Sequence, residues 1–274
     1  GDPQDWLQGD EWDSVMNYDA FMEPLTWFLT GMEKHSDESK PQLKGSVKDF
    51  EGAMRHYMAS FQTSQLLCAM NELSNHDHSR FMTRTNEKVG RAAVLGTAAA
   101  EEGIKPAVFR EAVVVQMTWP GAPTVYYGDE AGLCGFTDPD NRRTYPWGKE
   151  DIVLIDFHRD IIRIHKENEA LRTGSLMFLK GDDNLRGDDN LLCYARFNRK
   201  QQFVVLINNK EQRDVELEVW QCGIPKNAVL ERVIVSNETG YSLMPKKYEV
   251  VDGVLKLSLQ KYSAAVLMYD RTRS

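Results

Sequence analysis

The sequence predicts an α/β domain followed by an all-β domain, and a change of pattern along the chain indicates this. Over residues 1–172, short apolar runs alternate with helical patterns, an order typical of parallel strands joined by crossover helices. Over residues 173–274, short strand candidates are separated by turn residues, as in an antiparallel β-sandwich. Hydrophobic residues make up 42% of the 274 residues, enough to build a core in both domains.

Three apolar runs predict the strands of the first domain. They are SVMNY at 14–18, QLLCAMNEL at 65–73 and APTVYYGDE at 122–130, the last closed by Gly128. The second run is too continuous in apolar residues for a half-exposed strand, so we expect it to be buried. Because a helical pattern follows each run, the three strands are expected to lie parallel.

Three helical patterns complete these units. The first covers 46–61, where Ser46 can cap the N-terminus and apolar residues form one stripe. The second covers 105–119 and has Pro106 in its first turn. The third covers 150–171, and we expect its apolar face to point inward. That face consists of Leu154, Phe157, Ile161 and Ile164.

Seven short runs predict the strands of the second domain. They are SLMFLK, LLCYARF, QFVVLINN, DVELEVW, AVLERVIV, GVLKLSL and SAAVLMY. Between the first two lies the near-repeat GDDNLRGDDNLL at 181–192, which allows either a metal site or a polar hairpin. Gly-Asp-Asp-Asn is strong turn chemistry, so the hairpin is favoured.

The charge and cysteine content argue against several classes of partner. The formal net charge is −8, which speaks against nucleic acids and anionic membrane surfaces. No apolar stretch approaches the roughly 20 residues of a membrane span. The four cysteines are scattered without CxxC spacing, as is typical of reduced thiols. We therefore expect a cytoplasmic protein.

Polar residues gather where the predicted strands end, which is where ligands meet parallel α/β sheets. Tyr18 closes the first strand, and His76 and Asp77 follow the second. After the third come Glu130 and the loop GFTDPDNRRTYPWG. Carboxylates, an imidazole, guanidinium groups and aromatic faces suit hydroxyl-rich ligands such as sugars.

Structural interpretations of the same residues stay open. His76 and Asp77 can simply satisfy each other at the rim of the sheet. Asp138 and Arg142 in DPDNRR can form a salt bridge that only stiffens their loop. We expect Arg80 and His78 to brace the loop that carries Asp77.

Glu130 has two interpretations as well. It follows a strand next to the one that precedes Asp77, so the two carboxyl groups can be imagined as a pair. Glu130 also follows the tight turn YYGDE, and a role in holding the loop by hydrogen bonds is favoured.

Four motifs resemble glycoside hydrolase family 13, the α-amylase superfamily. NELSNHDHSRF resembles the region in which an Asn/Ser-His-Asp triplet follows barrel strand seven, and GAPTVYYGDEAG resembles strand eight. GFTDPDNRRTYPW is similar to the cyclomaltodextrinase, neopullulanase and maltogenic amylase branch. WLQGDEWDSVMNY resembles the segment that leads into strand six. The motifs follow the family's order and span essentially the whole chain.

The resemblance implies a specific architecture. Residues 1–172 match the last three strand–helix units of a TIM (β/α)8 barrel, and 173–274 match the family's C-terminal β-sandwich. A complete barrel takes about 250 residues, so the first domain is too short to close one. In this family the nucleophilic Asp follows strand four and the general acid Glu follows strand five. Both would lie upstream of Gly1, so we expect the chain alone to be inactive.

The resemblance also implies roles for individual residues. Asp77 matches the carboxylate that supports the oxocarbenium-like transition state, and His76 matches a sugar ligand beside it. Asp138 and Arg142 match residues that hold glucose on the non-reducing side. Tyr18 lies where this branch places an aromatic residue near the leaving group. No cofactor or metal is implied.

The expected function is that of a part of a retaining α-glucan hydrolase, acting on α-1,4 bonds of maltodextrins, cyclodextrins or pullulan. Two other functions remain open. The chain can be a non-catalytic carbohydrate-binding protein, or a purely structural part of a barrel. The expected partners are α-glucan oligosaccharides, with possible self-association or pairing with an N-terminal half, because three strands leave two sheet edges unpaired.

Overall fold

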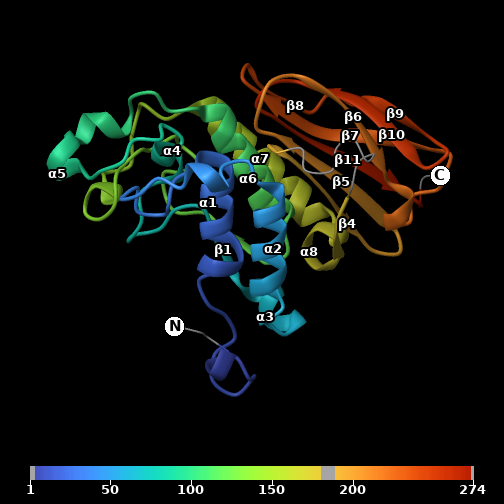
Figure 1. The fold of residues 1–274 in the computed structure, drawn as a ribbon, viewed down its shortest axis with the longest axis horizontal. Coiled ribbons are helices and arrows are strands. Elements are labelled where there is room, and N and C mark those ends of the chain that lie inside the picture. The colour runs from blue at the N-terminus through green and yellow to red at the C-terminus, as the bar shows by residue number, and fades with distance from the viewer. Residues whose placement is uncertain (1–3, 180–188, 273–274) are drawn as a thin grey trace.

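The computed structural model describes residues 4–179 and 189–272. Helices and short parallel strands make up the first part of the chain, and a large antiparallel sheet makes up the second (Figure 1). Helices α6 (Pro106–Thr118) and α8 (Glu169–Thr173) contact strands of this sheet. The predicted hairpin at 181–192 lies mostly outside the described residues.

The parallel strands are present in the predicted order, but they are short. Strand β1 (Met70–Glu72) pairs in parallel with β2 (Ala122–Thr124), and Met16 forms a single parallel bridge to Met70. The strand predicted at 14–18 is therefore reduced to one bridge. The chain then enters the π-helix η2 (Tyr18–Met22).

The strand predicted at 65–73 is wrong over most of its length. Helix α3 (Thr63–Cys68) occupies its first half, and only β1 is extended. A short apolar run has no periodicity that separates a buried strand from a buried helix, which explains the error. The run at 122–130 likewise becomes β2 followed by turns, with Gly128 at a φ of +84°.

The longer helices agree with the prediction. Helix α2 (Val47–Met58) is capped by Ser46, whose Oγ accepts a hydrogen bond from the amide of Asp49. The helix predicted at 150–171 is divided into α7 (Ile152–Glu167) and α8, which begins at Glu169. Helix α7 buries the predicted face, and Asp151 caps it through the amide of Leu154. Helix α1 (Glu23–Thr30) was not predicted, because it is short and seven of its eight residues are buried, so no exposed charged face marks it. The remaining short helices are η1 (Gln4–Trp6), η3 (Pro41–Leu43), α4 (Phe81–Arg84), α5 (Ala92–Leu95), η4 (Thr97–Ala100), η5 (Asp140–Arg142) and η7 (Trp220–Cys222).

The described residues of the second part form one continuous antiparallel sheet of nine strands, where two packed sheets were predicted. Its order is β3-β4-β5-β11-β7-β9-β10-β6, with β8 paired to β7. The strands are β3 (Ser175–Phe178), β4 (Leu191–Phe197), β5 (Gln201–Asn208), β6 (Arg213–Glu218), β7 (Ala228–Asn237), β8 (Gly240–Ser242), β9 (Lys247–Val251), β10 (Val254–Leu259) and β11 (Ser263–Asp270). The sheet curls, so that side chains from β4, β5, β6 and β10 share one core. Strands β8 and β9 were not predicted.

Two hydrophobic clusters hold the described residues together. One lies inside the curl of the sheet. The other joins the helices to the opposite face of the sheet, and includes Trp27, Phe109, Phe157, Tyr194 and Val266. None of the helices described here is long and apolar enough to cross a lipid bilayer.

Candidate active site

The loop after β1 is organised by the buried side chain of Asn75. Its Oδ1 accepts hydrogen bonds from the backbone amides of Asp77 at 3.0 Å and His78 at 3.1 Å. Its Nδ2 donates to Glu72 Oε2 at 3.1 Å and to the hydroxyl of Tyr18 at 3.0 Å. One amide therefore fixes both the Asp77 backbone and the Tyr18 hydroxyl.

Four of the predicted site residues form one cluster of charges. Arg142 Nε lies 2.6 Å from Asp138 Oδ1, and the guanidinium is 4.0 Å from Asp77 Oδ1. His76 Nε2 lies 3.4 Å from the same Asp77 oxygen. About half of each of these four side chains is exposed, between 49% and 52%, so the cluster remains open to a ligand.

Tyr18, the fifth predicted residue, joins the cluster through Asn75. Its hydroxyl donates to Met16 Sδ at 3.0 Å while it accepts from the amide, so its orientation is fixed. Burial raises the pKa of Tyr18, with Glu72 adding to the shift. The phenol therefore acts as a neutral aromatic face at the edge of the cluster.

The loop that carries Asp138 is tied to the loop that carries Asp77. The amide of Asp138 and the hydroxyl of Thr137 both donate to the Asp77 carbonyl. Arg142 Nε donates to the His76 carbonyl at 3.1 Å. The buried Asn141 adds two further bonds through Nδ2, to the carbonyls of residues 75 and 78.

Arg80 braces the site, as predicted. Its guanidinium is fully buried and lies 2.8 Å from Asp129 Oδ1. It also donates to the carbonyls of Tyr127 at 2.8 Å and Asn141 at 2.9 Å. The same group lies over the rings of Tyr126 and Tyr127, with centroids at 4.5 and 4.9 Å.

Glu130 interacts with the hydroxyl of Tyr145 in the following loop. Its Oε2 is buried without a hydrogen-bond partner. The interaction with Tyr145 supports the loop-holding interpretation.

Sequence reasoning missed Glu72, a buried carboxyl group at the end of β1. Burial raises the pKa of Glu72, while the hydrogen bond from Asn75 opposes this shift. His78 braces the loop, as predicted: its ring lies edge-on to Tyr18 with centroids 4.9 Å apart. Burial, assisted by Arg84, lowers the pKa of His78 to about 3, so this imidazole is neutral. Both residues lie within the motif NELSNHDHSRF, but only the fold shows which way each one faces.

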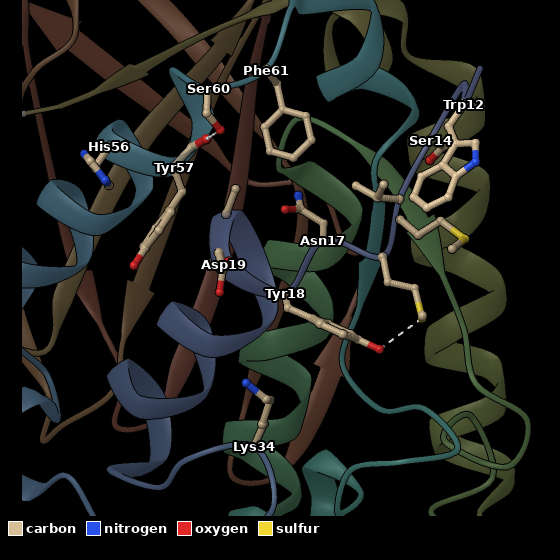
Figure 2. Close-up of a pocket in the computed structure, with 14 residues that line it drawn as sticks. Trp12, Ser14, Asn17, Tyr18, Asp19, Lys34, His56, Tyr57, Ser60 and Phe61 are labelled. Atoms are coloured by element: carbon tan, nitrogen blue, oxygen red, sulfur yellow. Dashed lines mark hydrogen bonds between the residues drawn. The ribbon is translucent and has the colours of Figure 1, made fainter. Parts of the chain in front are cut away.

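A groove with a volume of about 1100 Å³ is lined by Met16, Tyr18 and Lys34 among other residues. Figure 2 shows this groove. Aromatic residues line much of it, including Trp12, Tyr57 and Phe61. In Figure 2, Lys34 lies near one end of the groove and Phe61 near the other. Within the described residues, no group of three or more His, Cys, Asp or Glu side chains is placed to hold a metal ion.

Comparison with known proteins identifies the family. Residues 2–215 match the model of the α-amylase catalytic domain, and the chain belongs to this family. Neopullulanase 2 of Thermoactinomyces vulgaris is 30% identical over 273 residues. An amylopullulanase of Thermoanaerobacter thermohydrosulfuricus is 28% identical over 278 residues. The family resemblance found in the motifs is thus confirmed.

The solved structures agree. A debranching enzyme of Nostoc punctiforme superposes with a TM-score of 0.72 at 25% identity, covering 97% of this chain and 50% of that one. A cyclomaltodextrinase superposes with a TM-score of 0.69 at 23% identity. The chain spans only part of its relatives, since it covers 39% of neopullulanase 2 and 17% of the amylopullulanase, although 98% and 96% of its own residues align.

Proposed function

We propose that this chain supplies one side of the substrate cleft of a retaining α-glucan hydrolase that cleaves α-1,4 bonds. The observation that carries this proposal is the convergence of five motif residues from three separate segments: Tyr18, His76, Asp77, Asp138 and Arg142. Support also comes from the relatives, whose names are neopullulanase, cyclomaltodextrinase and maltogenic α-amylase.

In this proposal Asp77 acts electrostatically. Hydrolysis through an oxocarbenium-like transition state develops positive charge on the sugar ring. A carboxylate fixed beside that ring stabilises the transition state more than the ground state, which raises the rate. His76, next to the carboxylate, would donate a hydrogen bond to a sugar hydroxyl. Asp138 and Arg142 would bind hydroxyl groups of the neighbouring glucose, and Tyr18 would stack on the leaving-group side.

We further propose that the nucleophile and the general acid come from a segment outside this chain, so that the chain alone is inactive. A retaining glycosidase needs two carboxyl groups about 5–5.5 Å apart, one of them free to donate a proton. Asp138, a carboxylate beside Asp77, forms an ion pair with Arg142, whose Nε lies 2.6 Å from Asp138 Oδ1. Glu72 is buried and accepts a bond from Asn75. Neither arrangement favours a substitute for the missing pair.

The surface that would receive this segment is the groove of Figure 2. Met16 forms a single parallel bridge to Met70, and the exposed side chains of Trp12, Met16 and Tyr57 line the groove. Exposed apolar groups beside so short a strand contact favour the docking of a further segment. In the absence of that segment, we expect copies of the chain to associate through this surface. Sedimentation over a range of concentrations tests this, with Met16→Lys as the variant that should reduce association.

Two further assignments belong to this proposal. We place the domain boundary close to residues 172 and 173, and this is supported by the change from α8, which ends at Thr173, to β3, which begins at Ser175. A cytoplasmic location is supported by the four free cysteines, three of which are buried.

Calorimetric titration with maltotriose tests the sugar site directly. We expect weak binding by the intact chain and loss of that binding in Asp77→Asn. Equal binding by both proteins would place the sugar elsewhere and contradict the proposed cleft. The absence of binding in both would favour the purely structural alternative.

A further inference from the structure

A segment absent from the site motifs lies against the Asp77 loop. We call it the bracket segment, Glu33–Asp37, and it follows α1. The carbonyl of Lys34 accepts hydrogen bonds from the amide of Ser79 at 3.1 Å and from its hydroxyl at 3.0 Å. Because the Ser79 proton is committed to that carbonyl, Ser36 is the donor in the 2.8 Å bond between the two serine hydroxyls. The bracket segment therefore holds the end of the Asp77 loop through three bonds.

The bracket segment is itself held in shape. The carboxylate of Glu33 accepts hydrogen bonds from the amides of His35 at 2.8 Å and Asp37 at 2.6 Å. Glu33 is almost completely buried. These bonds fix the backbone from which the His35 side chain extends.

His35 reaches the site through Thr137. His35 Nδ1 lies 2.9 Å from Thr137 Oγ1, and the Thr137 hydroxyl donates to the carbonyl of Asp77. The amide of Asp138 donates to the same carbonyl at 3.3 Å. The contact thus lies at the point where the Asp77 loop meets the loop of Asp138.

The protons available to these two hydrogen bonds determine which tautomer the His35 imidazole adopts. A threonine hydroxyl has one proton, and a carbonyl can only accept. The Thr137 proton therefore points to Asp77, and Thr137 Oγ1 must act as the acceptor toward His35. For both bonds to exist, His35 Nδ1 must carry a proton. The neutral ring is consequently the Nδ1–H tautomer.

A second contact places the same ring against the site. The rings of His35 and His78 meet nearly edge-on, with centroids 4.6 Å apart, and His78 in turn packs edge-on against Tyr18. His35 therefore touches both routes that lead to site residues. One route runs through Thr137 to the Asp77 backbone, and the other runs through His78 to Tyr18.

We propose that His35 is a positioning residue of the sugar site: as the Nδ1–H tautomer, it holds Thr137 and thereby the backbone of Asp77 in place. This inference rests on the proposed function for its consequence in sugar binding. The tautomer itself follows from the geometry and can be tested without any sugar.

The first test is a long-range 1H–15N NMR spectrum of the imidazole groups in the intact chain. The spectrum is recorded at a pH at which the spectra themselves show the His35 ring to be neutral. The signals of His35 are assigned as those that disappear in His35→Asn. We expect the Nδ1–H pattern for His35. Thr137→Val, which has the same shape but no hydroxyl, should remove this preference, and Thr137→Ser should retain it. An Nε2–H pattern in the wild-type chain would overturn the proposal.

The second test is binding of maltotriose. Loss of one hydrogen bond at the site should weaken binding about two- to tenfold in Thr137→Val and in His35→Leu. His35→Asn can place an amide donor near the position of Nδ1, so it should restore most of the affinity. Wild-type affinity in Thr137→Val, together with loss of binding in Asp77→Asn, would refute the positioning role and leave the sugar site standing.

The two proposals can fail separately. A wild-type chain that does not bind maltotriose contradicts the proposed function. The positioning role is then judged by the tautomer and by the amide resonance of Asp77. That resonance should shift in Thr137→Val and return to its wild-type position in Thr137→Ser. An unchanged resonance in Thr137→Val would refute the positioning role.

Discussion

The guanidinium of Arg80 lies 2.8 Å from the carboxylate of Asp129, and both side chains are almost completely buried. Burial raises the pKa of Asp129, and Arg80 opposes the shift, so the pair balances desolvation against attraction. Arg80 also donates to the backbone carbonyls of Tyr127 and Asn141, which both lie in the stretch that follows β2. This pair therefore links the strand end after β1 to the loop after β2.

Replacement of Arg80 should strongly destabilise the chain. Arg80→Met leaves the Asp129 carboxylate buried without its cation, and such losses cost about 3–5 kcal/mol. Urea unfolding measures the change in the free energy of unfolding. Arg159→Met, at an exposed ion pair of α7, is the control and should cost below about 1 kcal/mol. A similar small effect in both variants would contradict the bracing role of Arg80.

Asn75→Asp should be destabilising despite its equal size. The change replaces the Nδ2 donor with an oxygen that faces Glu72 Oε2 and the Tyr18 hydroxyl oxygen. Loss of these bonds and the new contact between two carboxyl groups should cost about 2 kcal/mol or more. Thermal unfolding of the wild type and of Asn75→Asp measures this loss of stability. The control is Asn227→Asp, because Asn227 is exposed and bonds only through Oδ1, which aspartate keeps.

Arg142→Met separates binding from stability. Half of the Arg142 side chain is exposed, so its ion pair with Asp138 should contribute at most about 1 kcal/mol to stability. Maltotriose binding should nevertheless fall, because the guanidinium holds Asp138 and the His76 backbone in position. Titration calorimetry and thermal unfolding are measured on the same samples. Arg55→Met removes a comparable ion pair from α2 and should leave binding unchanged.

Glu111 should make stability depend on pH. Both of its carboxyl oxygens are buried without a hydrogen-bond partner, and burial raises the pKa of Glu111 well above its usual 4.5. The folded chain thus retains a proton that the unfolded chain has lost. Its contribution to stability is complete below the unfolded pKa and is lost as the pH rises through the folded pKa.

Glu111→Gln should remove this dependence, because the amide carries no charge at any pH. We expect the variant to gain stability over the wild type as the pH is raised from 5 to 8. Thermal unfolding at several pH values measures the difference. Glu249→Gln, at an exposed position on β9, is the control. Parallel pH profiles for the wild type and Glu111→Gln would contradict the prediction.

The sequence predicted the elements that carry their own periodicity. Helices α2 and α7 show apolar faces and a capping residue at the start, and both lie where the patterns placed them. The run from 65 to 73 was misassigned because α3 and β1 are both rich in apolar residues, and tertiary contacts decide between them. Helix α1 is short and buried on nearly all sides, so only Glu23, Thr26 and Thr30 mark a polar face in its sequence.

The site was predictable where a recognisable motif holds its residues, as for Tyr18 at the end of WLQGDEWDSVMNY. His76 and Asp77 belong to one motif, as do Asp138 and Arg142, and the structure brings the two motifs together. The contact of His35 with Thr137 joins residues 102 positions apart, and no short pattern encodes it. Residues that hold a site from outside its motifs therefore require the fold.

The measurement that most directly tests the central claim is release of p-nitrophenol from p-nitrophenyl-α-maltoside by the purified 274-residue chain. Asp77→Asn is assayed beside it. We predict no release by either protein, because the nucleophile and the general acid are proposed to lie outside this chain. Release by the wild type that disappears in Asp77→Asn would contradict this account and show that the chain holds a complete catalytic site.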